Sequence, residues 1–202
     1  MRTSLLPAAA VTAALIAAAP AHAATFKVVA ASHSSTSAKS TPDYTGTATA
    51  AWKLTRPTAG APNRLTLQNA GGTPVGLGTV AVKGAFAAQA TSRSGRCAFT
   101  APTGDREHAA VAPDEVILTV GPAPGGGVLV THSGVRASLA NPYFGSECST
   151  SVSGEPAVKE TMSRRVSAKL LSRRRVTLRF TGATNAGGIT YRWKTTFELV
   201  RR

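Results

Sequence analysis

The chain has 202 residues, of which 23 are lysine or arginine and 9 are aspartate or glutamate, for a formal net charge of +14 at pH 7. This length suits one domain with an adequate hydrophobic core. After residue 23 no segment is apolar enough to cross a bilayer as a helix, which excludes an integral helical membrane protein. The excess of cations directs attention to anionic partners.

The N-terminus has the order of a secretory signal peptide. A positive end with Arg2 precedes the apolar run Leu5–Ala19, and Pro20 and the small residues of Ala21–Ala23 follow. The apolar run has 15 residues, fewer than the roughly 18 to 20 that a membrane-spanning helix needs, which favours cleavage over a retained anchor. We expect 1–23 to be a signal peptide and 24–202 to be a single secreted domain.

The first polar stretch after this signal is Ser32–Asp43, "SHSSTSAKSTPD". Its serine- and threonine-rich composition predicts a mobile connector. This connector would either join the first two strands or tether the domain.

From Tyr44 onward, apolar and polar residues alternate with a period of two. In Tyr44–Thr55 the apolar residues share one parity and threonines dominate the other, and Thr79–Thr91 and Thr190–Val200 repeat the pattern. Gly84 marks a candidate bulge, and "GPAPGGG" at 121–127 predicts a hairpin loop. Many short strands with one wet face each predict an all-β domain of two packed antiparallel sheets, a β-sandwich, although a closed barrel would give a similar pattern.

Two cysteines, Cys97 and Cys148, are the only ones in the chain. An oxidising destination favours a disulfide between them, and two separate buried thiols are the alternative. Closing a loop of about 50 residues would stabilise the fold by roughly 4 kcal/mol. The bridge would also join the two halves of the chain, as expected for one domain.

Several features together carry a resemblance to a group of proteins. They are the alanine-rich export signal, the strand ending in "AAWKL", the single cysteine pair and the closing segment "VTLRFTGATNAGGITYRWKTTFEL". In this layout the chain resembles the small exported β-sandwich proteins of GC-rich bacteria. The resemblance implies an extracytoplasmic β-sandwich with an immunoglobulin-like arrangement and no assigned activity. Trp52 and Trp193 lie outside the interval between the cysteines, unlike the tryptophan of antibody domains.

Residues 164–180, "RRVSAKLLSRRRVTLRF", carry seven cations and no acid. Arg173–Arg175 cannot all lie in a half-buried strand, because alternate side chains would enter the core unpaired, so Arg173 and Arg174 are expected in a turn. Flanking strands would form a hairpin with the other cations facing outward. The candidate polyanion-binding residues are Arg164, Arg165, Lys169, Arg173, Arg174, Arg175 and Arg179.

The charge is also unevenly distributed. From Lys159 onward 12 cations oppose 2 acids, and no Asp or Glu occurs between Glu160 and Glu198. Such a surface predicts weak, salt-sensitive contacts with polyanions such as wall polymers, acidic polysaccharide or extracellular DNA. The alternative is a basic face that is only solvated and binds nothing. The nearby aromatics share the inward parity, so base stacking is not expected.

We expect a non-catalytic protein without a metal or cofactor. No histidine after the signal stands at a metal-ligand spacing from another histidine or cysteine, and no G-x-S-x-G motif occurs. One alternative is a secreted hydrolase or metal-dependent enzyme that uses Asp105, Glu107 and His108 of "GDREH". Another is an extracellular structural or assembly subunit.

Overall fold

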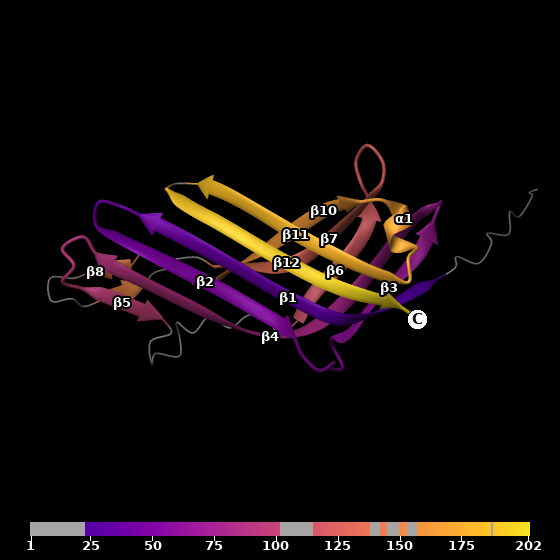
Figure 1. The fold of residues 1–202 in the computed structure, drawn as a ribbon, viewed down its shortest axis with the longest axis horizontal. Coiled ribbons are helices and arrows are strands. Elements are labelled where there is room, and N and C mark those ends of the chain that lie inside the picture. The colour runs from indigo at the N-terminus through magenta and orange to yellow at the C-terminus, as the bar shows by residue number, and fades with distance from the viewer. Residues whose placement is uncertain (1–22, 102–114, 138–141, 145–149, 153–156, 187) are drawn as a thin grey trace, which may run out of the picture.

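The computed structural model describes residues 23–101, 115–137, 142–144, 150–152, 157–186 and 188–202. Within these ranges the chain is almost entirely β-strand (Figure 1), which confirms the all-β prediction. The elements are β1 (Ala24–Ser40), β2 (Tyr44–Leu54), β3 (Pro62–Ala70), β4 (Thr73–Ser92), β5 (Ala98–Ala101), β6 (Glu115–Pro122), β7 (Val128–Ala137), β8 (Pro142–Phe144), β9 (Thr150–Val152), β10 (Ala157–Val166), α1 (Ala168–Leu171), β11 (Arg175–Ala186) and β12 (Ile189–Arg201).

Ten of the described strands form one antiparallel sheet. Its main path is β10-β7-β6-β4-β2-β1-β12-β11, while β3 pairs with β1 and β4, and β5 pairs with β4. The strands β8 and β9 form a separate two-stranded sheet. In Figure 1, β11, β12, β1 and β2 run side by side along the length of the molecule, and α1 and the C-terminus lie at the same end.

The large sheet curls, so that β7 and β10 face β11 and β12 across a shared interior. The ring of His132 on β7 meets Phe180 on β11 and Phe197 on β12 edge-on, with centroids 4.6 and 5.3 Å apart. The Thr195 hydroxyl on β12 donates to the sulfur of Met162 on β10 at 3.7 Å. The core therefore lies inside the curve of one continuous sheet.

Period-two alternation decides which side chains enter this interior. On β2, Tyr44, Ala48, Ala50 and Trp52 are buried and the intervening threonines are exposed, as predicted. Burying a large apolar side chain contributes about 1.5 to 3 kcal/mol, which is what stabilises the curled sheet. The main apolar cluster includes Phe26, Val28, Leu65, Val80, Leu118, Val130, Leu178, Phe197 and Leu199.

The structure corrects the prediction of a connector at 32–43, because residues 32–40 belong to β1. This strand pairs with β12 on one side and with β2 on the other. His33, Ser35 and Ser37 are buried on its inward face, and the residues between them are exposed. Composition alone missed this strand because its inward row contains His33, Ser35 and Ser37 and so shows no apolar alternation, although its backbone hydrogen bonds are satisfied on both edges.

The predicted basic hairpin at 164–180 is also wrong. Its two arms, β10 and β11, do not pair with each other: β10 pairs with β7, and β11 pairs with β12. Between them α1 begins after Ser167, whose side chain accepts a hydrogen bond from the backbone N–H of Leu170. A serine N-cap satisfies one of the first backbone N–H groups of a helix, which have no partner within the helix, and so favours a helical turn here. Arg173 and Arg174 do lie outside the strands, as predicted.

Two further expectations concern glycines. Gly84 pairs with Trp52 in unbroken register, so the predicted bulge is absent there, and the irregularities lie instead at Val28/Ala30 and Pro62/Arg64. The predicted loop at 121–127 does connect paired strands, β6 and β7. Gly125, Gly126 and Gly127 all have positive φ there, a conformation that favours glycine.

Candidate functional site

The seven predicted cations are all exposed, but they belong to three different elements and the turn between them. Arg164 and Arg165 lie on β10, Lys169 on α1, and Arg175 and Arg179 on β11. The Arg164 guanidinium donates to the carbonyl of Arg179 at 2.7 Å, and that of Arg165 donates to the carbonyl of Pro124 in the β6–β7 loop. These contacts orient the two guanidinium groups. Because backbone carbonyls carry no formal negative charge, the contacts do not neutralise the positive charges of Arg164 and Arg165.

Four cations from other parts of the chain join them. Lys27 on β1 is the register partner of both Val200 on β12 and Arg64 on β3, and Val200 in turn pairs with Arg175. Arg201 donates through its guanidinium to the Ser172 carbonyl at 3.3 Å. We call the whole set the basic end: Lys27, Arg64, Arg164, Arg165, Lys169, Arg173, Arg174, Arg175, Arg179, Arg201 and Arg202.

The signal that could have located the four additional residues was weak. Each stands alone or in a pair between uncharged neighbours, so no local cluster points to it. Only the strand register brings Lys27 and Arg64 opposite each other.

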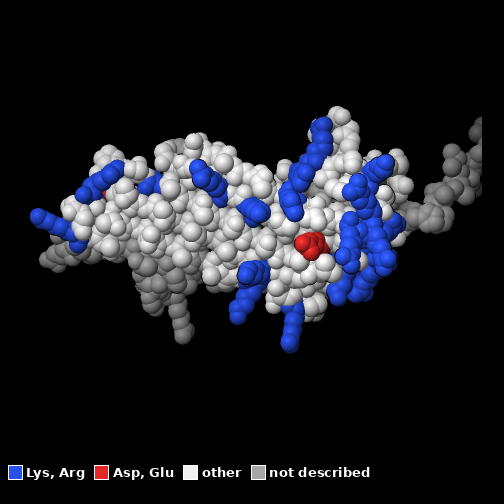
Figure 2. Space-filling view, viewed as in Figure 1, with Lys and Arg blue, Asp and Glu red and all other residues white. Residues whose placement is uncertain are grey.

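Cations also occupy the outward side of the sheet beyond the basic end. Exposed Lys53 on β2 pairs directly with exposed Lys83 on β4, and Arg192 and Lys194 project from β12. Among β1, β2, β4, β11 and β12, Glu198 is the one acidic residue. Figure 2 shows lysine and arginine crowded at the end that carries α1 and the C-terminus, with others spaced along the sheet. We call this outward row the basic face: Lys53, Lys83, Arg192 and Lys194.

Like charges directly opposite on neighbouring strands destabilise a sheet by a few tenths to about 1 kcal/mol per pair. The pairs Lys27–Arg64 and Lys53–Lys83 both have this arrangement. Bound anions would relieve the repulsion, and so would salt. The electrostatics of this surface therefore favour anionic ligands.

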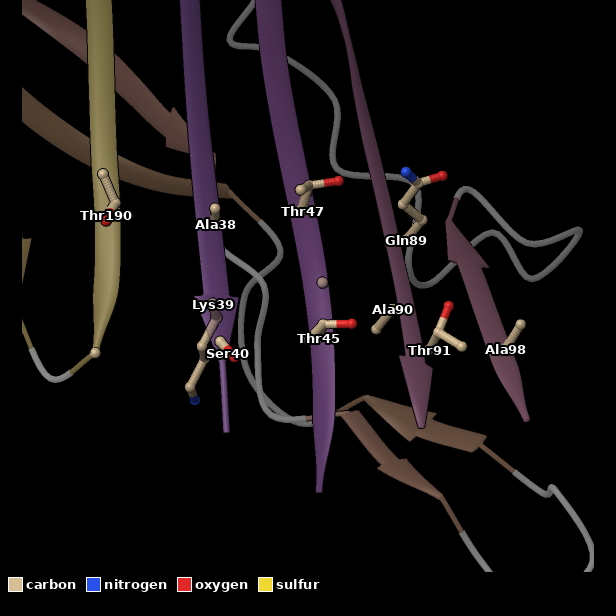
Figure 3. Close-up of a pocket in the computed structure, with 12 residues that line it drawn as sticks. Ala38, Lys39, Ser40, Thr45, Thr47, Gln89, Ala90, Thr91, Ala98 and Thr190 are labelled. Atoms are coloured by element: carbon tan, nitrogen blue, oxygen red, sulfur yellow. The ribbon is translucent and has the colours of Figure 1, made fainter. Parts of the chain in front are cut away.

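A hollow lies at the end of the same sheet that is opposite the basic end. It has a volume of about 610 Å³, and Figure 3 shows Thr45, Thr47, Gln89 and Thr91 along it. Among the described residues that line it, the one cation is Lys39, which lies over the Tyr44 ring at 5.5 Å from the centroid. Hydroxyl and amide groups without a carboxylate offer hydrogen bonds but no acid–base pair.

The interior contains a buried polar layer, which we define as His33, Trp52, His132, Met162 and Thr195. The Nδ1 of His33 lies 2.7 Å from the Thr195 hydroxyl, and its ring stacks on Trp52. The Nδ1 of His132 lies 2.9 Å from the Ser133 carbonyl and must donate to it, which leaves Nε2 buried without a hydrogen-bond partner among the described residues. Burial, with a smaller effect of His33, lowers the pKa of His132 from 6.5 to about 4 despite that backbone hydrogen bond.

This layer is sealed from solvent. His33 is 3% exposed, His132 is 1% exposed and Thr195 is 0% exposed. A substrate could not reach these groups without opening the sheet, so they do not form an accessible catalytic site.

The other sequence candidates are only partly within the described residues. Asp105, Glu107 and His108 lie outside them. In the part of the chain that the structure describes, no group of three or more His, Cys, Asp or Glu could hold a metal. Cys97 lies just before β5, where its N–H donates to the Ser92 hydroxyl, and Cys148 lies outside the described residues.

Within the described ranges no helix has the length and hydropathy of a transmembrane span. No protein-family model matches the chain, and no curated protein or solved structure is significantly similar to it.

Proposed function

We propose that the protein is an exported, non-catalytic β-sandwich protein that binds polyanions through its basic end and basic face. The observation that carries the proposal is the convergence of eleven cations, from β1, β3 and the segment after Ala157, on one end of the fold. Polyanions of the cell envelope, acidic polysaccharide and extracellular DNA share the chemistry that such a surface attracts.

Export is supported by where the folded strand begins. Ala24 is the first residue of β1 and pairs with Leu67 of β3. It is also the residue that follows the cleavage point expected from the sequence. Cleavage there would release the domain with its first strand intact.

The sandwich interpretation is supported by the curl of the sheet. Inward side chains of β7 and β10 face those of β11 and β12, as layers do in a sandwich. The proposal adds that the two cysteines form a disulfide, which suits an oxidising compartment.

The binding mechanism is counterion release. Each phosphate or sulfate neutralised by a cation frees a condensed counterion, so affinity falls steeply as salt rises. Residues two apart on a strand project from the same face at a spacing of roughly 7 Å, which suits the repeating charges of a linear polymer. The contacts are therefore many and individually weak.

Retention on heparin and DNA resins tests the proposal. The triple variant R173S/R174S/R175S should elute at lower salt than the wild type, and the salt slope of its affinity should fall by about one for each cation that no longer neutralises a phosphate. The matched control is K39S/R93S/R96S, which removes the same charge from the opposite end. If both variants show equally reduced retention, net charge and not the basic end is responsible, and the proposal is wrong.

A further inference from the structure

Beside the basic end, the surface contains a hollow of about 540 Å³ between the bulge in β1, the β2–β3 loop and the C-terminal residue. Lys27, Arg64 and Arg202 line it, together with Thr55, Asn63 and Val29. Of the described residues, no acidic side chain contributes to its lining. The predicted cation cluster at 164–179 does not contribute to it either.

The walls of the hollow are fixed by the backbone. β1 has a register shift between Val28 and Ala30, and β3 has one between Pro62 and Arg64. Asn63 sits at the second shift with φ of 53° and is buried. Its Nδ2 donates to the Thr55 carbonyl at 2.9 Å, and its Oδ1 accepts from the Ala81 N–H at 2.7 Å. The β2–β3 loop and the start of β3 are therefore held in place before any ligand arrives.

Three cations from distant segments converge on this hollow. Lys27 and Arg64 are direct register partners, and the backbone N–H of Arg202 donates to the Thr25 carbonyl at 2.9 Å. Among the described lining residues, no acidic side chain opposes the positive charges of these three side chains. A preorganised cationic hollow binds an oxyanion without the entropic cost of ordering its walls.

A neighbouring hollow provides the contrast. It has a volume of about 330 Å³ and shares Val29 and Leu54 with the hollow lined by Lys27, Arg64 and Arg202. Its lining contains Lys53, and Glu198 also lines it. Charge is balanced between these two side chains, so the excess of positive charge distinguishes the hollow with Lys27, Arg64 and Arg202.

We infer that the hollow formed by Lys27, Arg64 and Arg202 is a binding site for a single phosphate or sulfate group. Two guanidinium groups and an ammonium can donate several charge-assisted hydrogen bonds to one tetrahedral oxyanion. The inference deepens the proposed function, on which it rests for the identity of the natural ligand, by giving one charged group of a polyanion a defined binding site. The group could be carried by a polymer or by a small molecule, since the recognising chemistry is the same.

Titration of the purified protein with inorganic phosphate, pyrophosphate and sulfate, by calorimetry at fixed ionic strength, tests the site. We expect saturable binding with one site per chain. Substituting Lys27→Gln and Arg64→Gln together should weaken it at least tenfold. The same anions should raise the melting temperature of the wild type and leave that of the double variant unchanged.

The matched control is Lys39→Gln with Arg96→Gln, which removes two cations at the opposite end of the sheet, outside the basic end and the basic face. Its anion affinity should stay within twofold of the wild type. Equal weakening in both variants would overturn the inference in favour of general charge attraction. Absence of saturable binding would also overturn it, while salt-sensitive retention on heparin would leave the proposed function standing. Titration with phosphorylated and sulfated oligomers then separates a polymer source from a small-molecule source.

Discussion

Replacing His132 by phenylalanine should remove most of the acid sensitivity that the buried polar layer confers on the fold. His132 is 1% exposed, and burial lowers its pKa from 6.5 to about 4. The unfolded chain therefore takes up the proton first as the pH falls. The stability linked to His132 is present above pH 6.5 and is lost progressively between pH 6.5 and about 4.

The magnitude follows from the two pKa values. With one pKa unit equal to about 1.4 kcal/mol, the wild type should lose about 2 kcal/mol at pH 5 and about 3 kcal/mol at pH 4 through this residue. Phenylalanine retains the edge-on contacts with Phe180 and Phe197 but cannot titrate. At pH 7 the substitution has two opposing effects on the unfolding free energy, each of about 1 to 3 kcal/mol. Loss of the hydrogen bond to the Ser133 carbonyl lowers it, and removal of the buried Nε2 without a partner raises it.

Urea unfolding at pH 7, 6 and 5 measures the difference. The contributions of the other titratable groups are present in both proteins and cancel, apart from the effect of His33 on His132. The variant should lose about 2 kcal/mol less than the wild type between pH 7 and pH 5. If the two proteins lose stability in parallel, the buried imidazole is not the acid-sensitive group and the reasoning is refuted.

Three further predictions concern packing, the cysteines and export. Gly182→Ala places a Cβ against the Trp193 indole on the neighbouring strand and should lower the unfolding free energy by about 1 to 3 kcal/mol. Gly121→Ala should not lower it, because the space around Gly121 is open. Urea unfolding followed by tryptophan fluorescence compares the two variants. Reduction of the proposed Cys97–Cys148 bridge should cost roughly 4 kcal/mol, and intact-mass analysis with and without reductant tests whether the bridge exists. Secreted protein should begin at Ala24 on N-terminal sequencing, and a mature chain that retains the apolar run would contradict cleavage.

Parity predicted correctly which side chains of β2, β11 and β12 point inward. The outward threonines of β2 and the exposed cations of β11 follow directly from alternation. Composition failed at 32–40, because a serine-rich segment can form a strand when both of its edges are paired. The hairpin at 164–180 failed because sequence proximity is a poor guide to which strands pair.

The residues of the candidate site could likewise be predicted from the sequence only in part. The seven cations at 164–179 could be identified from their density, and all of them are exposed. Lys27, Arg64 and Arg202 could not, since they are separated by many residues and meet only through the pairing of β1 with β3 and the anchoring of the C-terminal residue at Thr25.

The all-β class and the wet and dry faces of most strands follow from the order of residues alone, because side-chain direction in a strand depends only on odd or even position. Which strands are neighbours, where the bulges lie and which cations share a hollow became visible only in the folded chain. These features depend on register between distant segments, and register is set by how the whole sheet buries its inward face.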